Sequence, residues 1–249
     1  MPLAKVAVIC AVWHSDALRH ELLPGHQANL DHQTVPVERI YVFDDNDAPP
    51  PGLCGTVVTV SERLTIYQAW NVALSLVRSE YVMNLNLDDR LAPDAIEKLL
   101  AALESTPEAF LAGGDWHIRY TQRETDEVRP CFPLEELPFD PAWPPIADSV
   151  TRLGSGDALR GTLGPACMWR MAAHLRVPRY PWRFNDNSPI KTIGDTIWWF
   201  TISHRLKKKL LRVPLVIGNY LSHPDSQAEF RTAGTEENAK FCEIGCSLL

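Results

Sequence analysis

The chain has 249 residues, of which 45% are hydrophobic and 22% charged, and its formal net charge is -7 at pH 7. This composition is typical of a globular protein, and the length suits a single α/β domain with long loops. The acidic balance argues against nucleic acid as the main partner, because binding the phosphate backbone needs a surplus of lysine and arginine. No run of about 20 apolar residues predicts a membrane span. The short apolar start at residues 1–10 does not resemble a signal peptide, so we expect a cytoplasmic protein.

Strands and helices alternate through the first part of the chain. The apolar runs predict strands at residues 5–12, 39–43, 56–60, 81–83 and 110–113. Helical spacing of apolar residues predicts helices at residues 17–30, 65–77 and 94–104. Alternation at this spacing indicates an α/β domain with a mostly parallel central sheet and right-handed crossovers.

The regular pattern is expected to break at residue 115. Prolines recur and periodic runs are few between residues 115 and 161, which is typical of a lid or binding loop, or of a disordered segment. Trp143 in this stretch is a candidate to contact an acceptor. Order returns at residues 162–170, a helix is expected from residue 194 to residue 209, and a last strand from 211 to 220.

A basic run lies near the predicted end of that helix. It comprises Arg205, Lys207, Lys208, Lys209 and Arg212. Cations at a helix C-terminus complement the helix dipole, and we favour this role. A patch for an anionic membrane surface is the alternative.

Two pairs of aspartates follow predicted strands. Asp88 and Asp89 follow the strand at residues 81–83, and Asp44 with Asp45 ends the strand at residues 39–43. In open α/β sheets ligands bind outside the carboxyl ends of the strands, so both pairs are expected at one ligand-binding edge. Adjacent residues of an extended strand face opposite sides. We therefore expect Asp88 and Asp89 to divide their work, one binding a sugar hydroxyl and the other Mg²⁺ or Mn²⁺. The alternative is that they only end a strand and solvate a turn.

Other arrangements of the same residue types fit less well. A response regulator also gathers aspartates at a sheet edge, but it carries its acidic pair after the first strand of a much shorter domain. A nucleotidyltransferase of similar fold is disfavoured because no glycine-rich phosphate loop follows the first strand.

The order of the motifs resembles that of family 2 glycosyltransferases with the GT-A fold, and the resemblance covers nearly the whole chain. The segments that carry it are residues 6–14, 40–45, 67–71, 86–94, Gly164-Pro165 with 168–170, Gly194-Asp195, and Tyr220 with 223–226. The resemblance implies a single Rossmann-like domain over residues 1–249 with a long acceptor-side loop. Residues 1–114 would form its nucleotide-sugar-binding half and residues 115–249 its acceptor-binding half.

The resemblance also implies an activity. An inverting, hexosyltransferase-like enzyme would move a sugar from a UDP-, GDP- or dTDP-linked donor to the hydroxyl of a glycan or other acceptor, as in polysaccharide biosynthesis. By family position, Asp44 would contact the base with the Ala11 backbone beside it, Asp88 would contact the ribose, and Asp89 would bind Mn²⁺ or Mg²⁺. Contact with a membrane surface is compatible with this activity. A relative that binds a nucleotide or glycan without turnover is the alternative.

The remaining site residues come from the same resemblance. Asp195 would be the general base, although aspartate near a helix start is also an ordinary cap, and Asp186 is its rival. His223 would be a further metal ligand, or simply an exposed loop histidine. Asn71 would bind the donor or make a structural hydrogen bond. The sequence departs from the family pattern at Val12-Trp13-His14 and at Asn86, where longer DxDD motifs carry an acidic residue.

Overall fold

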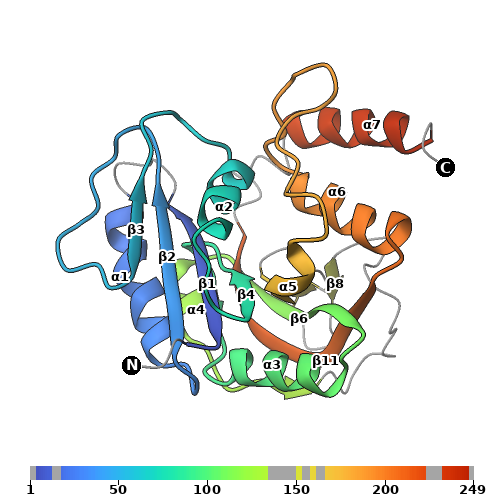
Figure 1. The fold of residues 1–249 in the computed structure, drawn as a ribbon. Helices are drawn as coiled ribbons and strands as arrows, with labels where there is room; N and C mark the ends of the chain where they lie inside the picture. Colours follow the sequence, from blue (N-terminus) through green and yellow to red (C-terminus); the bar gives the residue numbers. More distant parts are fainter. Residues whose placement is uncertain are drawn as a thin grey trace.

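A mixed β-sheet forms the centre of the protein (Figure 1). The structure is a computed structural model that describes residues 4–12, 18–133, 150–152, 158–160, 166–222 and 232–246. The main path of the sheet has the strand order β3-β2-β1-β4-β10-β6-β11-β5. Its strands are β1 (Val6–Val12), β2 (Val37–Phe43), β3 (Thr56–Thr59), β4 (Tyr81–Asn84), β5 (Arg90–Leu91), β6 (Ala109–Arg119), β10 (Met168–Arg170) and β11 (Lys209–Leu221).

Short strands and helices complete the described part of the chain. The short strands at the margins are β7 (Phe132–Pro133), β8 (Val150–Arg152) and β9 (Ala158–Arg160). The helices are α1 (Leu18–Asp31), α2 (Ile66–Leu74), α3 (Ala95–Ser105), α4 (Gln122–Asp126), α5 (Met171–His174), α6 (Gly194–Phe200), the π-helical turn η1 (Thr201–Arg205) and α7 (Thr232–Cys246).

Parallel pairing dominates the half of the sheet that the N-terminal strands build. Strands β3, β2, β1 and β4 pair in parallel, and β6 pairs in parallel with β11. The short strand β10 is antiparallel to both β4 and β6 and joins the two halves. The predicted α/β fold, a mostly parallel central sheet flanked by helices, is therefore confirmed.

Two apolar cores cover the two faces of this sheet. Along β1, Ala7 and Ile9 point into the core that contains α2 and α6, while Val6 and Val8 point into the core that contains α3. Every one of these four side chains is at most 1% exposed. A strand covered on both faces reads as a continuous apolar run, which is why β1 was predictable without alternation.

The start of α2 is defined by a capping box. The Thr65 hydroxyl accepts a hydrogen bond from the Gln68 amide, and the Gln68 side chain accepts one from the Thr65 amide. These reciprocal bonds satisfy two amide groups that no helical carbonyl reaches. Tyr67 and Trp70 are thereby fixed on the buried face of α2.

Two boundaries predicted from the sequence were wrong. Order does not break at residue 115, because β6 continues to Arg119 and α4 follows it. The helix that begins at Gly194 does not reach Lys209. It loosens into the π turn η1, and Lys207 then adopts a left-handed φ of 51° that turns the chain into β11. Sequence periodicity also missed α7.

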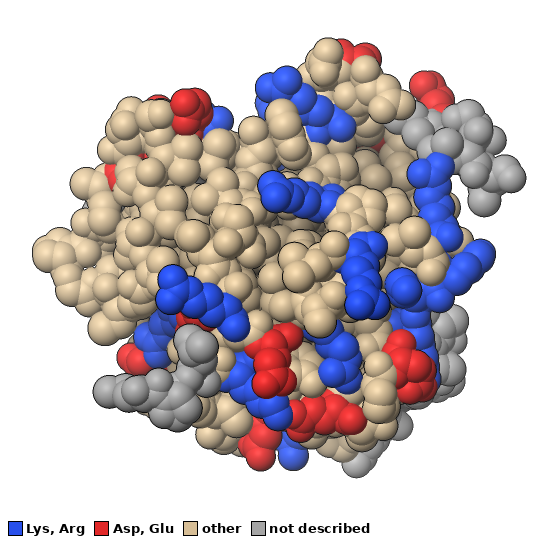
Figure 2. Space-filling model, viewed as in Figure 1, with Lys and Arg blue, Asp and Glu red and all other residues tan. Residues whose placement is uncertain are grey.

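The basic run consequently does not end a helix as predicted. Arg205 lies in η1, Lys207 and Lys208 lie in the following turn, and Lys209 and Arg212 belong to β11. Figure 2 shows lysine and arginine side chains around the region of α5 and η1, whereas many acidic side chains in this view lie at the lower edge near α3. Within the described ranges, none of the helices has the length and apolar character that crossing a bilayer requires.

Candidate active site

The carboxyl ends of β1, β2 and β4 form one edge of the sheet. Parallel register places Val12 opposite Phe43 and Ile9 opposite Asn84, so all three strands end on the same side. Asp44 follows β2 directly, and Asp88 and Asp89 lie in the turn that joins β4 to β5. Because Asp88 and Asp89 are in a turn, the strand alternation invoked from sequence does not apply to them. The structure still separates them, since Asp89 is fully buried and Asp88 only half-buried.

The Cys10 thiol on β1 reports how close this turn comes to the strand. Burial is the main cause of the raised pKa of Cys10; the Asp88 and Asp89 carboxylates raise it further, and the Arg90 guanidinium lowers it. A nearby negative charge disfavours the thiolate, which requires both carboxylates to lie within electrostatic reach of β1. Two carboxylates and one guanidinium therefore lie within electrostatic reach of β1.

Asp44 has one occupied and one unoccupied carboxylate oxygen. Its side chain is 6% exposed, and its Oδ2 accepts a hydrogen bond of 2.8 Å from the Leu64 amide. Its Oδ1 is buried and has no hydrogen-bond partner among the described residues. A buried acceptor without a donor is costly, so this oxygen is suited to an N–H group supplied by a ligand.

Asp89 connects the acidic turn to the end of β11. Its Oδ1 accepts a hydrogen bond of 3.1 Å from the Leu221 amide, and its Oδ2 accepts one of 3.2 Å from the Asn86 side chain. Leu221 is the last residue of β11, the strand after which His223 follows in the sequence. His223 itself lies outside the described residues, as does Trp143.

Arg90 holds the acidic turn in place. Its guanidinium donates to the carbonyls of Leu87 at 2.9 Å and Asp89 at 2.8 Å, and to the Asp126 carboxylate of α4 at 2.8 Å. The residue is 2% exposed. Gly25 of α1 leaves room for it, since a Cβ there would stand 2.5 Å from the Arg90 Nη2. Arg90 therefore fixes the backbone on both sides of Asp88.

The residues of this turn fit a hard divalent cation. Carboxylate and amide oxygens are the ligands that Mg²⁺ and Mn²⁺ prefer. Besides the two carboxylates, the Asn86 Oδ1 is buried without a hydrogen-bond partner among the described residues. Those residues contain no cluster of three or more His, Cys, Asp or Glu that could hold a metal ion. Asn86, Asp88 and Asp89 thus supply oxygen ligands of the right chemistry but not a complete protein cage.

Asp195 comes from helix α6 and not from the turn that carries Asp88 and Asp89. It is the second residue of α6 and not its cap, because Ile193 occupies the cap position. Its Oδ1 accepts hydrogen bonds from the Tyr67 hydroxyl at 3.2 Å and from the Thr196 amide at 2.8 Å. Gly194 is required by close packing, since a Cβ there would lie 2.6 Å from both the Pro181 carbonyl and the Tyr67 ring. Asp195 is therefore held against α2 by specific contacts.

Cys167 links Asp195 to the acidic edge. Its amide donates to the Asn84 Oδ1 at 3.2 Å, and Asn84 is the last residue of β4. Burial raises the pKa of the Cys167 thiol well above its usual range, and the Asp195 carboxylate raises it further. Cys167 therefore lies within electrostatic reach of Asp195 and also contacts β4, the strand that leads to Asp88 and Asp89. Neither Asn84 nor Cys167 carries a motif by which the sequence could have flagged it.

Residues 32–130 match the family model described as glycosyl transferase family 2. This range, which is less than half of the chain, is similar to glycosyl transferase family 2. The matched range includes Asp44, Asn71, Asp88 and Asp89 but ends before Asp195. A comparison with curated proteins gives no match.

Solved structures of glycosyltransferases share the fold. TarS of S. aureus, residues 1–349, superposes with a TM-score of 0.55 at 13% identity, over 87% of this chain and 60% of that one. The same TarS fragment in complex with UDP-GlcNAc superposes with a TM-score of 0.55 at 15% identity, over 88% of this chain and 59% of that one. The mannosyltransferase PcManGT from Pyrobaculum calidifontis, in complex with GDP-Man and Mn²⁺, superposes with a TM-score of 0.55 at 14% identity, over 90% of this chain and 59% of that one.

The solved structures confirm the predicted GT-A fold, and the family model supports the predicted resemblance to glycosyl transferase family 2. The chain spans about 60% of the length of these structures. At such low identity their likeness establishes the fold alone.

Two residues of the family 2 pattern have contacts that bear on their roles. Both polar atoms of the Asn71 side chain pair with the backbone of Tyr180, donating at 2.8 Å and accepting at 3.1 Å. This arrangement favours the structural alternative for Asn71. Ala11 lies near the end of β1 opposite Val42, one residue from the edge, and is half-buried.

Asp186, the rival of Asp195, is engaged in a separate exposed network. Its carboxylate accepts hydrogen bonds from the amide and hydroxyl of Ser188 and from the Lys240 amine, which lies at 2.8 Å. The hydrogen bond from Lys240 is the first cause that lowers the pKa of Asp186, followed by those from Ser188. A carboxylate with a strongly lowered pKa is a poor proton acceptor, so Asp195 remains the better candidate for a general base.

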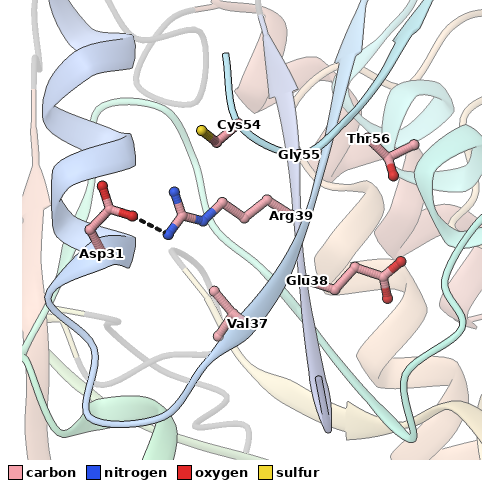
Figure 3. A pocket seen from close by; sticks show the side chains of 7 residues that line it. All are labelled: Asp31, Val37, Glu38, Arg39, Cys54, Gly55 and Thr56. Atoms are coloured by element: carbon pink, nitrogen blue, oxygen red, sulfur yellow. Dashed lines mark hydrogen bonds and ion pairs between the residues drawn. The ribbon is translucent and has the colours of Figure 1, made fainter. Parts of the chain in front are cut away.

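A shallow hollow of about 390 Å³ lies away from this site (Figure 3). It is lined at the starts of β2 and β3 by residues that include Val37, Arg39 and Thr56. Figure 3 shows Arg39 paired with Asp31 of α1, at 2.5 Å between Nη2 and Oδ1. Because these are the amino ends of parallel strands, the hollow is on the edge opposite the acidic turn. The hollow is therefore separate from the candidate site at Asp44, Asp88 and Asp89.

Proposed function

We propose that the protein is an inverting glycosyltransferase that moves a sugar from a nucleotide-diphosphate donor to an acceptor hydroxyl. The observation that carries this proposal is the acidic edge, where Asp44 follows β2 and Asp88 and Asp89 follow β4, the two strands that pair in parallel on either side of β1. Nucleotide-sugar chemistry needs acceptors for the base and ribose and a counter-charge for the diphosphate. The edge supplies residues for each of these needs.

The donor half would bind the nucleoside. Asp44 presents its unpartnered Oδ1 to a base N–H, with the Ala11 backbone beside it. Asp88, half-buried in the turn, accepts hydrogen bonds from the ribose hydroxyls. Asn71 supports the site indirectly by fixing Tyr180. Similar folds bind UDP, UDP-GlcNAc and GDP-Man, which makes UDP- and GDP-linked donors the first to test, with dTDP-linked donors next.

Asp89, with Asn86 and Asp88 beside it, would hold Mn²⁺ or Mg²⁺, and His223 would add a ligand. When bound, the cation neutralises the departing diphosphate as a Lewis acid. Arg90 keeps the carboxylates of the turn from moving as that charge develops.

Asp195 would act as the general base. It takes the proton of the acceptor hydroxyl while the acceptor oxygen bonds to the anomeric carbon, and the bond from that carbon to the phosphate oxygen breaks on the opposite side. One inversion of the anomeric configuration follows from this single displacement. The Tyr67 hydroxyl, which donates to Asp195 at 3.2 Å, fixes the orientation of the carboxylate.

Calorimetric titration with UDP, GDP and dTDP, with and without Mn²⁺, tests the donor site. Asp89→Ala should abolish the metal-dependent part of binding, and undiminished binding in this variant would refute the metal role. Asp195→Asn should bind nucleotide normally and lose transfer, measured with UDP-GlcNAc and GDP-Man as first donors.

The competing function is a binding protein that keeps the fold without turnover. It predicts nucleotide binding in the wild type with no donor hydrolysis and no effect of Asp195→Asn. The division into a donor half at residues 1–114 and an acceptor half at 115–249 belongs to the proposed enzyme, as do a cytoplasmic location and a role in polysaccharide biosynthesis. Exposed Arg205, Lys207 and Lys208 supply cations for contact with a membrane surface.

A further inference from the structure

Helix α7 is attached to the segment that leads to Asp195. Glu237 of α7 is 7% exposed, and its two carboxylate oxygens accept three hydrogen bonds. The donors are the Lys191 amide at 2.8 Å, the Thr192 amide at 2.9 Å and the Thr192 hydroxyl at 2.8 Å. Charge-assisted bonds of this kind are about twice as strong as neutral ones. Thr192 lies three residues before Asp195 in the sequence.

The neighbouring residues on the same face of α7 contact the same region. Lys240 donates to the Asp186 carboxylate at 2.8 Å and to the Ser188 hydroxyl at 2.9 Å. The Phe241 ring meets the ring of Phe200 at the end of α6, with 5.4 Å between the ring centroids. Residues three and four apart share one helix face, so Glu237, Lys240 and Phe241 form a single docking surface.

Residues 190–194, which α7 contacts, are tightly packed between Glu237 and Asp195. Ile190 and Ile193 are buried in the core on either side of the two residues that Glu237 binds. Gly194 is wedged between the Pro181 carbonyl and the Tyr67 ring, so little freedom separates Thr192 from Asp195. A shift of the Thr192 backbone would therefore move Asp195 relative to Tyr67.

We propose that Glu237 is a positioning residue, which holds residues 191–192 so that the Asp195 carboxylate meets the acceptor hydroxyl. The proposal deepens the proposed function and rests on Asp195 being the base. Glu237 does not touch the reacting atoms, and its effect passes through the backbone of Thr192. Helix α7 is accordingly a working part of the acceptor site.

Hydrogen exchange measured by mass spectrometry tests the attachment without any substrate. Glu237→Ala should speed the exchange of the Lys191 and Thr192 amides at least about tenfold, because these donors lose their buried acceptor. Glu236→Ala is the matched control, since Glu236 is the neighbouring exposed carboxylate of the same helix. Equal exchange in the two variants would overturn the proposal.

Kinetics then test the positioning role. Glu237→Ala should lower kcat for Mn²⁺-dependent turnover of UDP-GlcNAc or GDP-Man on the order of 10–100-fold, the usual effect of a misplaced reacting group. Glu237→Gln, which keeps the shape and one acceptor oxygen, should lie between. Affinity for UDP or GDP should stay within about twofold, because binding energy from the donor half is untouched. Faster exchange with unchanged kcat would also overturn the proposal.

A double variant separates this proposal from the proposed function. In the Asp195→Asn background, Glu237→Ala should add less than about twofold to the loss, because both act through one group. If Asp195→Asn leaves turnover intact, the proposed base is wrong, while the exchange data still decide whether Glu237 holds residues 191–192. A full further loss in the double variant would refute action through Asp195.

Discussion

Replacing Arg90 by methionine should both loosen the turn that carries Asp88 and Asp89 and lower the stability of the protein. The guanidinium satisfies the buried carbonyls of Leu87 and Asp89 at 2.9 and 2.8 Å, and methionine keeps much of the aliphatic stem while removing every donor. Each buried carbonyl left without a partner costs ~1–3 kcal/mol, so two of them cost about 2–6 kcal/mol. The lost bond to Asp126 adds little, because that carboxylate is 48% exposed. We expect the free energy of unfolding to fall by about 3 kcal/mol if water reaches one carbonyl.

The matched control for this variant is Arg123→Met. Arg123 is 91% exposed and makes an ion pair of 3.6 Å with Glu127, four residues on, so its loss should cost less than about 0.5 kcal/mol. Urea unfolding followed by tryptophan fluorescence measures both, and titration with UDP or GDP and Mn²⁺ should show about tenfold weaker binding by Arg90→Met alone. A loss of stability below about 1 kcal/mol would refute the assigned hydrogen bonds. Lost stability with unchanged nucleotide affinity would show that the turn keeps its shape without Arg90.

Three further changes have defined outcomes. Asp44→Asn should weaken nucleotide binding about tenfold by calorimetry through loss of a charged acceptor, and exposed Asp45→Asn should not; equal effects would remove Asp44 from the site. Burial is the main cause that lowers the pKa of His26 to about 3, so the unfolded chain alone gains this proton as pH falls below about 6.5. The free energy of unfolding should therefore fall as the pH is lowered from about 6.5 to 3, by up to about 1.4 kcal/mol per pH unit for this residue. Urea titrations should show that His26→Asn removes this slope and that exposed His32→Asn does not. Gly194→Ala should cost about 2 kcal/mol and most of the turnover, because the added methyl meets backbone and an aromatic ring, and near-normal melting would contradict this packing.

The acidic edge of the sheet was more predictable than the surroundings of Asp195. Asp44 and the pair Asp88-Asp89 could be placed at one edge from sequence, because Asp44 follows one strand, the pair follows another, and the carboxyl ends of parallel strands lie on the same side of a sheet. The conformation of the turn was not predictable, since residues 85–89 between β4 and β5 adopt no periodic structure. Arg90 was named only as part of a motif, and its role depends on Asp126, which lies 36 residues away.

The surroundings of Asp195 depend on contacts between residues that are distant in the sequence. Tyr67 and Asp195 are 128 residues apart, and Glu237 lies 45 residues beyond Thr192. No local pattern distinguishes Glu237 from exposed Glu236 beside it. For Asn71 the sequence left two roles open, and the paired hydrogen bonds with Tyr180 favour the structural one.

The sequence by itself determined the α/β class, most of the N-terminal strands and helices, and the acidic residues at the carboxyl ends of β2 and β4. These follow from hydrophobic periodicity and from residues adjacent to strand ends, which are local properties of the chain. Only the tertiary structure decided that the helix after Gly194 ends in a π turn at Arg205, that Arg90 fixes the acidic turn, and that α7 holds the segment before Asp195. These features arise where buried polar groups find partners far along the chain, and the need to satisfy such groups selects partners by position in space.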